Sequence, residues 1–155
     1  MSHPPHDPSD ETGGKMRVES IFDHVKMVRT HKVSGVVNLP EFREVLQGIY
    51  AHRQFNPDMN ALWDLRHADF AGVAPEDVRS LMQIVVTNWN RNGRCRAAIV
   101  VAGMAPYGIS RMYESQFGVA APCKIKVFLD VNLAWKWFEA SDDTVDAMAS
   151  RPLRK

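Results

Sequence analysis

The segment WDLRHADF, residues 63–70, brings together four side chains that often do chemistry in proteins: Asp64, Arg66, His67 and Asp69. It directly continues an apolar run that is typical of a buried strand. In one interpretation Asp64 or His67 is a general base and Arg66 holds an anion. In the other, Asp64 accepts backbone N–H groups at a strand end and Arg66 pairs with Asp69. The second is favoured, because catalysis needs a converging partner that spacing alone does not supply.

A second candidate is GMAPYGISRMYESQFG, residues 103–118, which joins an apolar strand to the start of a helix. Free backbone N–H groups at a helix start can receive an anion. Met104 and Tyr107 would supply an apolar wall and Arg111 a charge, although Arg111 also has Glu114 three residues on as a partner. Strand-to-helix loops of a parallel sheet meet at one edge, where ligands bind. The predicted ligand-binding residues are therefore Asp64, Arg66, Met104, Tyr107 and Arg111.

The elements that must position these loops alternate along the chain. Strands are predicted over residues 17–22, 25–33, 61–65, 95–102 and 124–129. Helices are predicted from Asn38, from Pro75, after residues 103–106, and around Ala134, Trp137 and Phe138. The order β-β-α-β-α-β-α-β-α predicts an α/β fold with a mostly parallel sheet, in which the first strand runs antiparallel to the second.

Local signals support several of these elements. Asn38 is a plausible N-cap because Glu41 follows three residues later. The nearly continuous apolar run Cys95–Ala102 is typical of an interior parallel strand with both faces covered. Residues 124–129 alternate instead, with lysines on one side, which indicates an edge or one-sided strand.

Length and composition set the class of protein. The chain has 155 residues, enough for one domain, and a net charge of +1 that does not favour nucleic-acid binding. No apolar run is long enough for a membrane span, and the N-terminus lacks the apolar stretch of a secretory signal. We expect a cytoplasmic protein with a disordered tail over 1–15, a domain over 16–140, and a short helix and tail over 141–155. Cys95 and Cys123 are interpreted as reduced thiols.

Several catalytic and cofactor motifs are missing. The chain contains no G-x-x-x-x-G-K-[ST] phosphate loop, no G-x-G-x-x-G after a strand, no G-x-S-x-G and no H-E-x-x-H. His3 and His6 lie in the polar tail, which rarely holds a specific metal site. The sequence therefore predicts no metal, no cofactor and no catalytic residue.

Three motifs resemble the SpoIIAA-like proteins of the STAS superfamily: WDLRHADFAG, YGISRMYE and KVFLDVNLAWKWF. The resemblance covers roughly residues 17–140, and it is to a bacterial STAS-like branch of unknown function with a loose likeness to CRAL-TRIO lipid-transfer domains. It implies a β-α fold with the helices largely on one side of the sheet.

The best-known activity of the superfamily is a switch, in which a serine of a D-S-S-G-type motif is phosphorylated after the third strand. This chain has AGVAPEDVR there, and Ser80 comes a full turn later. The resemblance therefore implies a non-enzymatic binding or regulatory module without that switch. It would bind a small anionic or amphipathic, lipid-like ligand or a protein partner. The alternative is a small enzyme that uses the Asp64 and His67 loop.

Helices largely on one side would leave the other face of the sheet to be covered. The first two strands carry valine and isoleucine on that face in either register. We therefore expect a homodimer that uses these strands or their exposed face.

Overall fold

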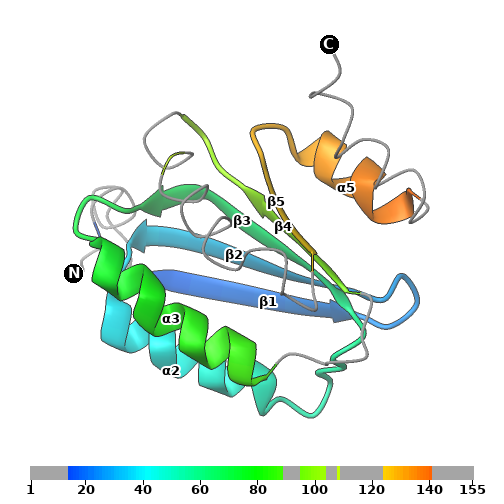
Figure 1. Ribbon diagram of the computed structural model, residues 1–155, viewed down its shortest axis with the longest axis horizontal. Helices are drawn as coiled ribbons and strands as arrows, with labels where there is room; N and C mark the ends of the chain where they lie inside the picture. The colour runs from blue at the N-terminus through cyan, green and yellow to red at the C-terminus, as the bar shows by residue number, and fades with distance from the viewer. Residues whose placement is uncertain (1–13, 89–94, 104–107, 109–123, 141–155) are drawn as a thin grey trace, which may run out of the picture.

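Figure 1 shows the computed structural model of the chain, which describes residues 14–88, 95–103, 108 and 124–140. The described strands are β1 (Arg17–Asp23), β2 (Val28–Val36), β3 (Asn60–Asp69), β4 (Arg96–Val100) and β5 (Lys124–Phe128). The described helices are α2 (Leu39–Tyr50), α3 (Pro75–Thr87) and α5 (Val131–Glu139). The strands form one five-stranded sheet in the order β1-β2-β3-β4-β5. β1 is antiparallel to β2 and all other neighbours are parallel, which confirms the predicted fold class.

The two faces of the sheet carry different helices. Helices α2 and α3 lie side by side on one face, and α5 lies on the other (Figure 1). Side chains alternate along a strand, so Trp63 of β3 packs against α2 while its neighbour Leu62 packs against α5. We call these the α2/α3 face and the α5 face. Of the three described helices, two share one side of the sheet.

Helix α5 is held over β3, β4 and β5 by an apolar cluster and by one arginine. The cluster consists of Val28, Leu62, Ala98, Val100, Phe128, Ala134 and Trp137. Arg96, at the start of β4, is 6% exposed and its guanidinium donates to the carbonyls of Trp137 and Phe138. These carbonyls lie at the C-terminal end of α5, where the helix dipole also stabilises a cation.

Strand β3 is longer than the sequence predicts, and this changes the setting of its polar residues. We predicted that the strand ends at Leu65 and that Arg66, His67 and Asp69 follow in a strand-to-helix loop, which is wrong. The strand runs on to Asp69 because β2 continues to pair with it beyond an irregularity. Lys32 is opposite Asp64 but Ser34 is opposite His67, so one extra residue of β3 is accommodated there.

Strand β2 also begins later than predicted, at Val28. The side chain of Asp23 accepts the backbone N–H groups of Val25 and Lys26, each at 3.0 Å, and so closes a turn over these residues. Met27 follows with a positive φ of 56°. Val25 and Lys26, which the sequence prediction placed in the strand because of its apolar residues, therefore belong to an Asx-type turn.

The predicted helix starts are confirmed. Asn38 is the N-cap of α2, and its side-chain oxygen accepts the N–H of Glu41 at 2.9 Å. Helix α3 begins at Pro75, with Asp77 accepting the N–H of Ala74 at 2.9 Å. The helix predicted after residues 103–106 lies almost entirely outside the described residues, as do most of the N-terminal tail and the segment 141–155.

Gly14 and Lys15, which precede β1, contact the end of β2 at Gly35 and Val36. The N–H of Val36 donates to the carbonyl of Gly14 at 3.0 Å. Gly35 has a φ of +85°, and a Cβ there would lie 2.3 Å from the carbonyl oxygen of Lys15. Only glycine permits this backbone angle and this close approach without strain.

Cys95, which directly precedes β4, is disulfide-bonded. Its interpretation as a reduced thiol is therefore wrong. The other cysteine of the chain, Cys123, lies outside the described residues. Within the described part, no helix has the length and apolarity to cross a membrane, and no group of three metal-binding side chains occurs.

Candidate functional site

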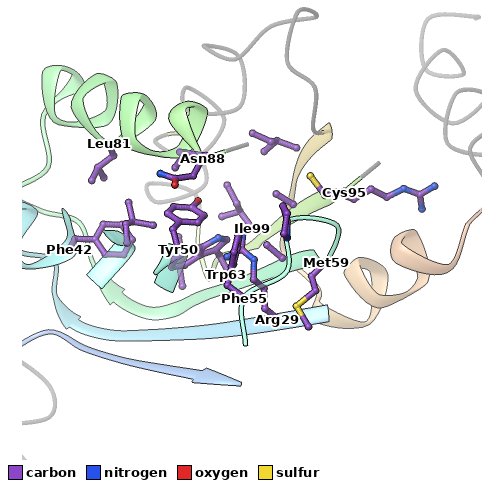
Figure 2. A pocket seen from close by; sticks show the side chains of 18 of the residues that line it. Arg29, Phe42, Tyr50, Phe55, Met59, Trp63, Leu81, Asn88, Cys95 and Ile99 are labelled. Atoms are coloured by element: carbon purple, nitrogen blue, oxygen red, sulfur yellow. The ribbon is translucent and has the colours of Figure 1, made fainter. Parts of the chain in front are cut away.

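A cavity of about 110 Å³ lies between the sheet and the pair of helices α2 and α3 (Figure 2). Its floor comes from β3 and β4 and its roof from the helices, and nearly all the lining is apolar. The lining includes Phe42, Leu46, Tyr50, Ala61, Trp63, Leu65, Leu81, Val85, Ala97 and Ile99. The cavity follows from the fold, since every second residue of each strand faces the helices.

Trp63 stands at the middle of this floor. Its ring centroid is 5.7 Å from that of Phe42 on α2, with the rings edge to face. On its other side the ring of His31 lies 4.4 Å away. These contacts fix the orientation of the indole between the sheet and α2.

One end of the cavity is polar, and a buried arginine marks it. Arg29 on β2 is 7% exposed, and its guanidinium carbon lies 5.5 Å from the ring centroid of Tyr50 and 5.1 Å from that of Phe55. Both distances are within the range of a cation–π interaction. Arg29, Phe55 and Cys95 lie at the amino ends of the parallel strands or just before them. This polar end is therefore opposite the edge at which the sequence predicts a ligand.

The guanidinium of Arg29 is oriented by His31, two residues along the same strand. Nη1 of Arg29 lies 2.9 Å from Nε2 of His31, and Oγ of Ser20 lies 2.7 Å from Nδ1. An arginine can only donate, so Nε2 must accept and the ring proton must sit on Nδ1. His31 therefore donates to Ser20, and a hydrogen-bonded chain leads from β1 to the cavity.

Burial determines the protonation of this chain. Desolvation and the nearby Arg29 charge lower the pKa of His31 from 6.5 to about 3. Burial raises the pKa of the Tyr50 hydroxyl, and Arg29 partly opposes that rise. At neutral pH the histidine and the tyrosine are both uncharged, and Arg29 carries the positive charge at this end of the cavity.

Ser20 and His31 have the spacing of a nucleophile and its base, but the proton is on the wrong side. A base must accept the serine proton at Nδ1, and here Nδ1 is already protonated. Moving that proton to Nε2 would point it at the N–H groups of Arg29. The pair is therefore arranged to hold Arg29 and not to activate Ser20.

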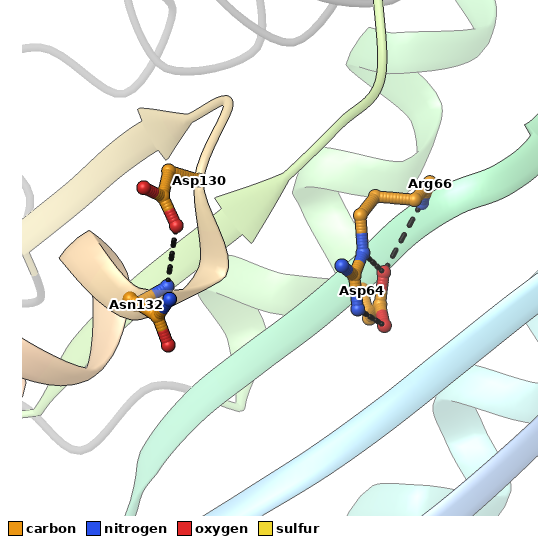
Figure 3. Close-up of polar contacts among 4 residues, drawn as sticks. All are labelled: Asp64, Arg66, Asp130 and Asn132. Carbon is orange, nitrogen blue, oxygen red and sulfur yellow. Dashed lines mark hydrogen bonds and ion pairs between the residues drawn. The ribbon is translucent and has the colours of Figure 1, made fainter.

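Asp64 and Arg66 lie on the opposite, α5 face of the sheet and are bonded to each other (Figure 3). The guanidinium donates from Nε to Oδ1 at 2.9 Å and from Nη2 to Oδ2 at 2.8 Å, and the backbone N–H of Arg66 donates to Oδ1 at 3.2 Å. These hydrogen bonds lower the pKa of Asp64, against an opposing effect of burial. The Asp64 side chain is 5% exposed and that of Arg66 is 38% exposed.

The sequence favoured a pairing of Arg66 with Asp69, but Arg66 forms its ion pair with Asp64. The side chain of Asp69 accepts the N–H of Ala71 at 2.9 Å and so shapes the turn after β3. His67 is exposed on β3. Asp64 thus has its carboxylate engaged by Arg66, which weakens the hypothesis of a base at this position.

The structure brings together only part of the predicted ligand-binding set. Asp64 and Arg66 are joined as described, whereas Met104, Tyr107 and Arg111 lie outside the described residues. A site built from all five stays a prediction.

Sequence reasoning missed the polar end of the cavity. The signal was present in VRTHKV, residues 28–33, where Arg29 and His31 occupy alternate positions between valines. Arg29 and His31 share one face of this strand, which indicates either solvent or a buried polar partner on that face. The choice depends on α2, and Tyr50 lies at its last turn.

A solved structure supports the assignment of the fold. It is described as an uncharacterised protein of the DUF3478 family from Shewanella loihica PV-4 with a SpoIIAA-like fold. The match covers 89% of this chain and 98% of that one, at 19% identity and a TM-score of 0.51. The fold is SpoIIAA-like. No protein-family model and no curated protein matches the chain.

The SpoIIAA-like fold agrees with the resemblance drawn from the sequence motifs. At 19% identity the likeness extends to the fold alone. The description of the neighbour assigns it no ligand or activity, so function must be argued from the cavity and its residues.

Proposed function

We propose that the chain is a non-enzymatic, STAS-like binding module whose ligand is a small amphipathic anion held in the cavity between the sheet and α2/α3. The observation that carries the proposal is a buried arginine at one end of a cavity whose lining is mostly apolar. Such a cavity matches a ligand with an apolar body and one anionic head. In this proposal the ligand lies on the α2/α3 face, away from the Asp64–Arg66 pair.

The arrangement of Arg29 favours an anion for electrostatic reasons. A carboxylate accepts charge-assisted hydrogen bonds from a guanidinium, and such bonds are stronger than neutral ones. Low dielectric around Tyr50 and Phe55 strengthens the attraction relative to water. His31 already fixes one N–H of the guanidinium, so less side-chain entropy is lost when a ligand binds.

The volume of the cavity limits the ligand to a small molecule. The cavity of about 110 Å³ is smaller than the roughly 300–1,000 Å³ of a typical ligand pocket. A short saturated chain fits this better than a long-chain lipid, whose tail would extend out of the cavity. Hexanoate is therefore a suitable anionic probe, and hexan-1-ol has the same tail without the charge.

Calorimetric titration at pH 7 with hexanoate and with hexan-1-ol tests the proposal. We expect hexanoate to bind about ten-fold or more tightly than hexan-1-ol, because a charge-assisted hydrogen bond contributes about 1.5–3 kcal/mol. Arg29→Gln should remove this preference for the acid. Arg66→Gln, which changes a partly exposed arginine on the α5 face of the sheet, is the matched control and should bind both probes like the wild type.

A second variant keeps the proposal testable if Arg29→Gln fails to fold. Ala97 is half-buried on the cavity floor, and Ala97→Met adds volume there without removing a contact. We expect it to lose both probes while the fold is kept. Hexanoate binding that survives both substitutions, or no binding in the wild type, would reject the cavity as the ligand site.

The absence of a phosphoserine switch fits the same proposal. Ser80, the serine nearest to the motif position, lies inside α3 and its hydroxyl accepts a hydrogen bond from Arg43 of α2. A phosphate there would not lie at the N-terminus of α3, where the helix dipole favours a negative charge. The module is therefore proposed to respond to ligand and not to phosphorylation at this position.

We also propose that the chain associates with a second copy of itself, as the sequence predicts. What supports this is the α5 face beyond α5, where Ile21 on β1 is 63% exposed. Strand β1 also lies at the edge of the sheet. A cytoplasmic location likewise stays a prediction.

A further inference from the structure

Within the described part of the chain, strand β1 is an open edge of the sheet. Among the described residues it pairs with β2 alone, and none of its seven residues is buried. The opposite edge strand, β5, has five residues and two of them are buried. An edge strand of this length presents a row of backbone N–H and C=O groups that another strand can satisfy.

The sequence of this edge, RVESIFD, is complementary to itself in the antiparallel direction. If two copies overlap fully about Ser20, Arg17 of one lies opposite Asp23 of the other, at both ends of the pair. Opposite residues of an antiparallel pair share a face, and both Arg17 and Asp23 belong to the α5 face. Opposite charges in such positions stabilise the pairing.

Shifted registers are unfavourable. A shift of two residues in one direction places Glu19 opposite Glu19 of the second copy, and in the other direction places Glu19 opposite Asp23. Like charges directly opposite each other destabilise a strand pair. A one-residue shift would align the α2/α3 face of one copy with the α5 face of the other. Full overlap about Ser20 is therefore the register that the charges select.

A groove beside β1 has room for the side chains that a second strand would bring. It has a volume of about 440 Å³ and runs between β1 and the C-terminal half of α2. Phe22 and His52 stack on its wall with ring centroids 4.7 Å apart, and Gly48 leaves open space on α2. In the full-overlap register, Val18 and Phe22 of the second copy lie on this same face of the sheet.

We propose that two copies of the chain pair antiparallel through their β1 edges, centred on Ser20, to form one continuous sheet. This inference rests on the self-association proposed above and specifies its surface and register. A pair of seven-residue strands is a small interface compared with the roughly 1,200 Å² of a stable one. We therefore expect a reversible dimer that forms with increasing concentration.

Disulfide trapping under mild oxidation tests the register, with the full chain and its native cysteines as the background. Ser20→Cys should form a covalent dimer with itself, because directly opposite residues are close enough for a disulfide. Arg17→Cys and Asp23→Cys should each remain monomeric alone but cross-link when mixed. Ser20→Cys loses the hydrogen bond to His31. If it fails to fold for that reason, the mixed pair still tests the register.

Sedimentation of the wild type distinguishes failure of self-association from failure of the β1 edge as its surface. A monomer at high micromolar concentration would overturn both self-association and the β1 interface. A dimer without either cross-link would leave self-association intact and overturn the β1 edge as its surface. Arg17→Asp should weaken the dimer, because like charges then lie opposite each other, and it leaves the turn that Asp23 closes intact. Hexanoate binding is independent of all these outcomes.

Discussion

Arg29 donates to Nε2 of His31 at 2.9 Å, and this hydrogen bond fixes the histidine as a neutral ring with its proton on Nδ1. The same contact orients the guanidinium at the end of the cavity. Two residues that alternate along one strand thus determine both the charge of the site and the absence of a catalytic base at Ser20. The arrangement agrees with a binding module better than with an enzyme.

The depressed pKa of His31 predicts a loss of stability on mild acidification. The unfolded histidine binds a proton near pH 6.5, whereas the folded one does so only near pH 3. Protonation therefore favours the unfolded state as the pH falls from 6.5, by about 1.4 kcal/mol per pH unit. Urea unfolding of wild type and His31→Gln between pH 6.5 and 4.5 should show a much flatter slope in the variant.

His67→Gln, an exposed histidine-to-glutamine change outside the Ser20–His31–Arg29 chain, is the matched control for this experiment. A slope unchanged in His31→Gln would mean that His31 is not held neutral in the fold.

The Asp64–Arg66 pair should stabilise the sheet. Arg66→Met leaves the buried carboxylate of Asp64 without its side-chain donors, and we expect a loss of about 1–2 kcal/mol in the free energy of unfolding. The value is below that for a fully buried pair because Arg66 is 38% exposed. Chemical denaturation measures it, and Asp64→Leu/Arg66→Met should recover part of the loss. If Arg66→Met were as stable as the wild type, the pair would have no structural role.

Arg96 should hold α5 on the sheet. Arg96→Met removes the donors to the carbonyls of Trp137 and Phe138, and we expect a loss of about 2 kcal/mol. Trp137 is 5% exposed, so its fluorescence should shift to the red if α5 loosens. The exposed Arg79→Met is the matched control. An unshifted spectrum with unchanged stability would show that the apolar cluster alone docks the helix.

Much of the fold could be predicted from local signals. The cap at Asn38, the proline at the start of α3 and the apolar run of β4 each have a local physical cause, and all three are confirmed. The end of β3 could not be predicted in this way. It depends on pairing with β2 beyond Lys32, which keeps Arg66 and His67 in the sheet although their polarity is typical of a loop.

The candidate site was harder to predict because it is assembled from distant segments. Arg29 and Tyr50 belong to different elements, and only the packing of α2 over β2 brings them together. The sequence drew attention to WDLRHADF because its polar residues are adjacent. Asp64 and Arg66 point to the α5 face and bond to each other, so local density of charge was a poor guide to the position of a cavity.

The location of bound hexanoate tests the central proposal most directly. Nuclear Overhauser contacts between ¹³C-labelled hexanoate and the methyl groups of the wild-type chain would show which face it occupies. We expect contacts to Ala97 and Ile99 on the cavity floor and none to Ala98 or Val100, which lie on the α5 face. Contacts to Ala98 and Val100, or none to the cavity floor, would contradict the proposal.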